Sequence, residues 1–199
     1  MRLGGAEILS PKHIQQIESA LPTAQQCYDW VLLYRYSKGV KSLENVLENA
    51  KKGTSTLFVI KDSHGGIFGS IVTEKIKDEA YYYGKGPGSI AVWSFLNNGV
   101  IHIFPAYSMH NSDYISTSTK AISFGNKECP AIYIDSQFKG KSYKCPTFSS
   151  PCLSSAEEFT LQELEIYSLE HTLNKSSYAD NSKKVVDSSW SPPRRSFSK

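Results

Sequence analysis

The 199-residue sequence contains no long hydrophobic run, although 40% of its residues are hydrophobic. A membrane-spanning helix needs about 18 or more consecutive apolar residues, so membrane insertion is not expected. The first 16 residues lack the apolar core of a secretory signal, and they are not rich in arginine like a mitochondrial presequence. We therefore expect one cytoplasmic domain, with the nucleus and the mitochondrion as alternative locations.

Motifs for metal binding and catalysis are also absent. The sequence has no C-x-x-C pair, no H-E-x-x-H pattern and no G-x-S-x-G elbow. A Ser-His-Asp triad stays open, because its members can meet in space without a sequence pattern. We assign no catalytic, cofactor-binding or metal-ligating residue. In an intracellular protein the four cysteines are expected to be free thiols: Cys27, Cys129, Cys145 and Cys152.

Two local patterns imitate functional motifs. The run Gly84-Lys85-Gly86-Pro87-Gly88 has neither phosphate-loop spacing, and Pro87 removes one backbone amide, so we interpret it as a connection between strands. The carboxylates of Glu157 and Glu158 suggest an acid–base pair. However, Ser155-x-x-Glu158 is also a capping box, which predicts the start of a helix.

Basic residues are concentrated at the C-terminus. Residues 175–199 hold six basic and two acidic side chains, whereas the remainder holds 16 basic and 17 acidic ones. The body is therefore not expected to bind nucleic acid. We expect residues 8–170 to form the folded domain. Residues 171–199 are rich in serine, lysine and proline, which predicts a disordered basic tail.

The remaining patterns predict helices first and strands afterwards. Ser10-Pro11 and Ser42 suit helix starts, each followed by apolar residues at helical spacing. Later runs are short, apolar and separated by turn residues, which is typical of an antiparallel β-sheet. His64 is expected at a turn, and His102 on a strand opposite its isoleucine neighbours. The expected strands cover residues 57–60, 67–72, 90–95, 100–104, 121–124, 131–134 and 164–169.

The ordered set of these patterns resembles the TLDc domain, the module of the oxidation resistance family. The resemblance rests on short matches spread over roughly residues 8–170. They are Asp29-Trp30, Leu32-Leu33-Tyr34, Ser42-Leu43, Val59-Ile60-Lys61-Asp62, Gly66, Phe68-Gly69, Tyr82-Tyr83-Gly84, Trp93-Ser94-Phe95, Ala121-Ile122, Cys145, Thr147-Phe148, Leu153-Ser154, Glu158-Phe159 and Leu164-Glu165-Ile166.

This resemblance implies an α+β fold: a two-layer antiparallel β-sandwich flanked by short helices. It also implies a non-enzymatic interaction module that protects against oxidative stress and binds the vacuolar-type proton ATPase, regulating its assembly or activity. The sequence departs from the family where a glycine-rich run is usual, because here only Gly125 remains.

A different hypothesis is a thiol-dependent antioxidant enzyme. Cys145 is its first candidate, because the adjacent Lys144 would favour a thiolate. A small side chain that packs a loop is the simpler interpretation of Cys145.

Overall fold

The computed structural model describes residues 6–21, 23–37, 42–84, 88–95, 99–107 and 111–171. The predicted tail beyond His171 lies outside these residues. The described elements are α1 (Pro11–Ala20), the 3-10 turn η1 (Thr23–Gln25), β1 (Tyr28–Ser37), α2 (Leu43–Ala50), β2 (Thr56–Asp62), β3 (Ile67–Val72), β4 (Glu79–Tyr83), β5 (Ile90–Phe95), β6 (Ile101–Pro105), β7 (Ile115–Thr117), β8 (Ala121–Phe124), β9 (Ile132–Asp135), β10 (Lys139–Lys141) and β11 (Glu158–His171).

Both predicted helix starts are confirmed. Ser10 precedes α1 with an extended backbone, and its hydroxyl accepts the main-chain N–H of His13. Ser42 caps α2 in the same way through Asn45. Serine is favoured at this position because it satisfies an amide that has no partner within the helix. Among the described residues, no helix is long and apolar enough to cross a membrane.

The strands form one antiparallel sheet that folds into two layers. Strands β1, β11, β2, β3, β5 and β6 make the first layer, sheet A; strands β4, β7, β8, β9 and β10, joined to the start of β11, make the second, sheet B. The long strand β11 belongs to both, because Glu158–Thr160 pair with β10 and later residues pair with β1 and β2. The predicted α+β sandwich is therefore confirmed.

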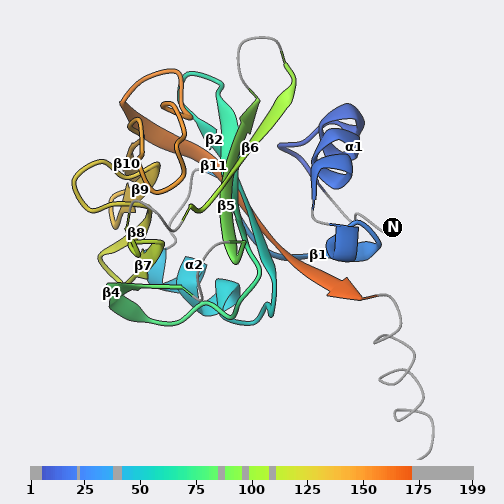
Figure 1. Cartoon of the computed structure of the whole chain (residues 1–199), viewed down its shortest axis with the longest axis horizontal. Coiled ribbons are helices and arrows are strands. Elements are labelled where there is room, and N and C mark those ends of the chain that lie inside the picture. Colours follow the sequence, from blue (N-terminus) through green and yellow to red (C-terminus); the bar gives the residue numbers. More distant parts are fainter. Residues whose placement is uncertain are drawn as a thin grey trace, which may run out of the picture.

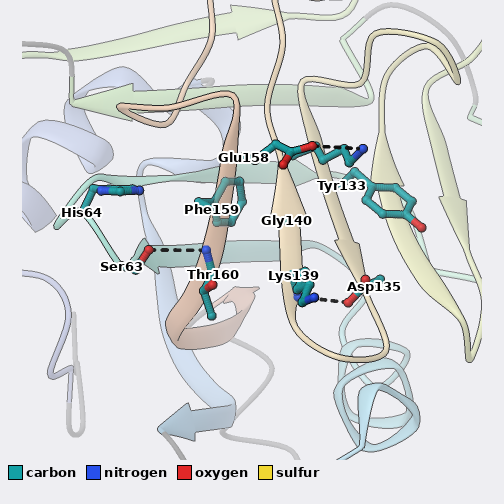
Figure 2. A pocket seen from close by; sticks show the side chains of 10 residues that line it. Ser63, His64, Tyr133, Asp135, Lys139, Gly140, Glu158, Phe159 and Thr160 are labelled. Carbon is teal, nitrogen blue, oxygen red and sulfur yellow. Dashed lines mark hydrogen bonds and ion pairs between the residues drawn. The ribbon is translucent and has the colours of Figure 1, made fainter.

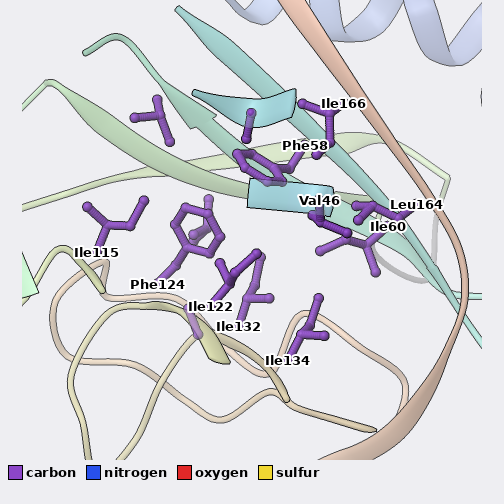
Figure 3. Close-up of a cluster of buried hydrophobic side chains, with 14 of the residues drawn as sticks. Val46, Phe58, Ile60, Ile115, Ile122, Phe124, Ile132, Ile134, Leu164 and Ile166 are labelled. Carbon is purple, nitrogen blue, oxygen red and sulfur yellow. The ribbon is translucent and has the colours of Figure 1, made fainter. Parts of the chain in front are cut away.

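The main core fills the space between the two layers. On β2, Phe58 and Ile60 point into it and meet Ile122 and Phe124 of sheet B, while Val46 of α2 closes one side (Figure 3). Phe58 and Phe124 stack edge to face, with ring centroids 5.4 Å apart. Side chains alternate across a strand, so Phe58 and Ile60 share one face of sheet A.

The intervening residues of β2 build a second core on the opposite face of sheet A. Leu57 and Val59 pack there with Trp30, Trp93 and Tyr167. The segment from Ala6 to Leu21, which includes α1, covers this face, so sheet A lies between sheet B and α1 (Figure 1). Burial on both faces explains why residues 57–60 are continuously hydrophobic.

The predicted helix at Ser155 is wrong. Residues 153–157 form bends, and β11 begins at Glu158. Phe159 and Leu161 point into the main core, a period-two pattern that strand pairing with β10 and β2 satisfies. Tertiary pairing therefore overrides the local capping signal.

Candidate functional site

Two hollows meet at the turn between β2 and β3, and His64 lines both of them. One, of about 450 Å³, lies over the outer face of β9, β10 and the start of β11 (Figure 2). The other, of about 620 Å³, lies between the turn and the loop at 151–155. We call them together the turn groove. It is lined by Ser63, His64, Gly65, Gly66, Phe95, Tyr133, Asp135, Lys139, Gly140, Lys141, Pro151, Cys152, Leu153, Ser154, Ser155, Glu158, Phe159 and Thr160.

The side chain of Asp62 holds the turn between β2 and β3 in place. Its fully buried carboxylate accepts the main-chain N–H groups of His64 and Gly66, both at 2.8 Å. The other carboxylate oxygen accepts the Ser154 hydroxyl at 2.5 Å, which ties the loop to the turn. Gly66 is required, because an added Cβ would lie 2.6 Å from that carboxylate. His64 is thus an exposed side chain on a rigid support.

The opposite wall comes from β10. Lys139 and Lys141 point outward, while Gly140 lies under the ring of Phe159, whose atoms would be 2.3 Å from an added Cβ. Lys141 pairs with Glu158 at 3.4 Å, and both side chains are largely exposed. A hydrogen bond to Glu158, and then the nearby Tyr143, raise the pKa of Lys141. These charges are available to a partner at little desolvation cost.

The groove brings together a serine, a histidine and an aspartate, the residue types of a catalytic triad. Their bonding differs from a triad, in which the imidazole lies between the hydroxyl and the carboxylate. Here Ser154 donates directly to Asp62, and His64 contributes its main-chain N–H rather than its ring. This arrangement anchors a loop and does not activate the serine.

The candidate thiol Cys145 is fully buried. Its sulfur lies against Gly125, where an added Cβ would be 2.5 Å away, and its main-chain N–H binds the Ser150 carbonyl. The interpretation of Cys145 as a loop-packing side chain is confirmed. Cys152 is half-buried; its thiol donates to the carbonyls of Ser142 and Ser154, and burial raises its pKa. All four cysteines are free thiols, as expected.

His64 and His102 lie in different elements of the structure. His102 is exposed on β6 between two partly buried isoleucines, and His64 is at the turn, both as expected. His110 lies outside the described residues, as do residues 85–87 of the glycine-rich run. Its described ends, Gly84 and Gly88, lie after the end of β4 and before the start of β5. No group of three or more metal-ligating side chains occurs among the residues that the structure describes.

Sequence reasoning missed the anchoring role of Asp62 and a buried ion pair on the other side of sheet A. Glu165, which is fully buried on β11, pairs with Arg35 of β1 at 2.9 Å and accepts the Tyr167 hydroxyl at 2.7 Å. The Asp-x-x-Gly-Gly pattern at 62–66 was a sequence signal for the anchoring role of Asp62. The second had no local signal, because its partners are 130 residues apart.

The TLDc domain family model matches residues 3–170, nearly all of the described chain. Human oxidation resistance protein 1 is 30% identical over 168 residues, which cover 83% of this chain and 19% of that protein. Mouse nuclear receptor coactivator 7 is 30% identical over 166 residues, covering 82% and 17% respectively. The chain thus spans about a fifth of the length of these relatives. The chain therefore belongs to the TLDc domain family.

Proposed function

We propose that this chain is a non-enzymatic interaction module that protects against oxidative stress by binding the vacuolar-type proton ATPase and regulating it. The observation that carries the proposal is the TLDc match over residues 3–170, the region that oxidation resistance protein 1 shares with this chain. We place the module in residues 8–170, followed by a basic tail, and we place its action in the cytoplasm.

The turn groove is the surface that we assign to this binding. It combines a rigid base, provided by Asp62, with exposed polar side chains on both walls, His64 and Lys141 among them. Contacts built on a preorganised support lose less conformational entropy on binding. Phe95 and Leu153 add apolar area to the same groove.

The thiol-dependent alternative is disfavoured by the burial of Cys145. A thiol that reacts with peroxide must be reached by it and must ionise. Cys152, the other thiol near the groove, has a raised pKa, which lowers its thiolate fraction.

The test is a pull-down of the detached peripheral sector of the ATPase by the purified full chain. We expect recovery of the sector by the wild type and by a variant in which all four cysteines are serine. The double variant His64→Ala/Lys141→Ala should recover at least about tenfold less, corresponding to about 1.4 kcal/mol. Lys52→Ala, a change of another exposed lysine at the end of α2, is the matched control.

Deletion of the coding gene should impair organelle acidification and peroxide tolerance together. Failure to recover the sector, combined with unchanged acidification after deletion, would reject the ATPase proposal. If deletion lowers peroxide tolerance and the cysteine-free variant does not restore it, that result would favour the thiol hypothesis.

A further inference from the structure

The N-terminal arm, residues 6–21, covers the outer face of sheet A (Figure 1). Four of its side chains are buried there: Ile8, Leu9, Ile17 and Leu21. Within α1 itself Ile17 is the fully buried residue, and Ile14 is partly buried. The arm therefore covers the aromatic face of sheet A with four buried aliphatic side chains.

Polar contacts hold the arm at two places. Near its start, the main-chain N–H of Glu7 donates to Glu165 at 2.9 Å, and Arg35 bridges Glu165 and the Glu7 carboxylate. In α1, the Gln16 side-chain amide accepts the N–H of Ile101 at 2.9 Å and donates to the carbonyl of Gly99 at 3.2 Å. Glu7 is 62% exposed, so water competes for its side-chain contact.

Two tryptophan side chains under the arm have hydrogen-bond donors without an acceptor among the described residues. The indole Nε1 atoms of Trp30 and Trp93 are both buried there, with no hydrogen-bond acceptor among the described residues. Buried tryptophan N–H groups usually have an acceptor, and tryptophan is enriched at protein interfaces for this combination of area and polarity. The docked arm thus leaves two donors unsatisfied in one cluster.

The arm also leaves space beside it. An apolar hollow of about 230 Å³ lies between Ala20 of α1 and residues of sheet A that include Ile71, Ile103 and Pro105. A second, of about 560 Å³, is lined by Gln15 and Ser19 of α1 and by Val100 just before β6. Both hollows open to solvent at the edge of the arm, so a larger occupant of this face could extend into them.

We propose that the N-terminal arm is a displaceable cover, and that the face beneath it binds an amphipathic helix of a protein partner. The arm itself shows which pattern fits: apolar residues spaced like Ile14, Ile17 and Leu21, that is i, i+3 and i+7. Unlike the arm, the partner helix fills the 230 Å³ hollow and presents oxygen acceptors to the indoles of Trp30 and Trp93. This inference deepens the proposed interaction role but does not require the ATPase as partner.

The test uses a labelled synthetic peptide of residues 6–21 as the probe and the intact chain as the receptor. A partner that must displace the arm binds with an affinity that is reduced in proportion to the fraction of molecules in which the arm is undocked. Glu7→Ala removes the exposed ion pair with Arg35, so probe binding should tighten by at most about fivefold. Gln16→Ala removes two hydrogen bonds and should tighten probe binding by at least about fivefold. Gln15→Ala, one residue away and exposed, should leave probe binding unchanged.

Native-state amide exchange provides the second measurement on the same proteins. The amides of α1 should exchange faster than those of β2, with a further increase in Gln16→Ala, while the urea midpoint of the core stays near that of the wild type. Equal probe binding by all variants, or α1 amides that exchange only with global unfolding, would overturn the proposal. Neither assay contains the ATPase, so failure of the proposed function leaves these results unaffected.

Discussion

At the residue scale, two neighbouring serines have different roles. Ser154 is buried and donates to the Asp62 carboxylate, whereas Ser155 is exposed. Ser154→Ala leaves a buried carboxylate with one partner fewer, so it should lower the free energy of unfolding by about 1–3 kcal/mol. Ser155→Ala should change it by less than about 0.5 kcal/mol. Urea denaturation of both variants measures the difference, and equal midpoints would contradict the anchoring role of Asp62.

Two glutamates on β11 provide a second comparison, between a fully buried carboxylate and a partly exposed one. Glu165 is fully buried with Arg35, while Glu163 pairs with Lys61 at 2.8 Å and is 24% exposed. Removing one member of a buried pair costs about 3–5 kcal/mol, because the other charge stays buried. The median exposed pair contributes about 0–1 kcal/mol.

We therefore expect Glu165→Gln to be much less stable than Glu163→Gln in thermal and urea unfolding. Because Arg35 is 25% exposed, we expect the loss of unfolding free energy in Glu165→Gln to lie near the lower end of the range of about 3–5 kcal/mol. Similar losses for the two variants would show that water reaches Glu165 despite its burial.

At the element scale, we predict that the stability of the start of α1 depends on pH. His13 completes the cap of α1 by accepting the Ser10 N–H through Nδ1, and its ring packs at a tilt against that of Phe95, with centroids 4.4 Å apart. Burial and then the charge of Lys12 lower the pKa of His13. A lowered folded-state pKa stabilises the protein above the unfolded value, about 6.5, and this stabilisation is lost as the pH falls through the folded-state pKa.

Below that pKa the imidazolium cannot accept a hydrogen bond, and its charge is unfavourable at a helix N-terminus. We expect the amide protection of α1, corrected for intrinsic exchange, to decrease between pH 7.5 and pH 5. His13→Ala should remove this pH dependence, whereas His64→Ala should retain it. An unchanged pH dependence in His13→Ala would contradict the role of His13 in the cap.

At the same scale, elements whose signals lie within a few residues could be predicted from the sequence, whereas features that depend on distant strand pairing could not. Ser10-Pro11 and the β2–β3 hairpin carry their signals within a few residues, so both could be predicted. The Ser155-x-x-Glu158 signal was equally local but wrong, because Phe159 pairs across to Gly140 and forces a strand. The turn groove could not be predicted, since His64 and Lys141 line one hollow only because β11 pairs with both β2 and β10.

At the scale of the whole molecule, β11 joins the two layers and should make them unfold together. Leu164 and Ile166 face the main core, while Tyr167 and Leu169 of the same strand face the core under the arm. Loss of β11 would therefore remove one wall of both cores. The chain should behave as a single cooperative unit, although its two hydrophobic clusters are separate.

Ile166→Ala tests this cooperativity. Ile166 is fully buried in the main core, so truncation to alanine should cost about 2–5 kcal/mol. Trp30 and Trp93 lie in the other cluster, and their fluorescence reports on that cluster once Trp190 is replaced by phenylalanine. In this background, tryptophan fluorescence and far-ultraviolet circular dichroism should shift to the same lower urea midpoint. A fluorescence midpoint that stays at the wild-type value would show that the face under the arm unfolds independently of the sandwich core.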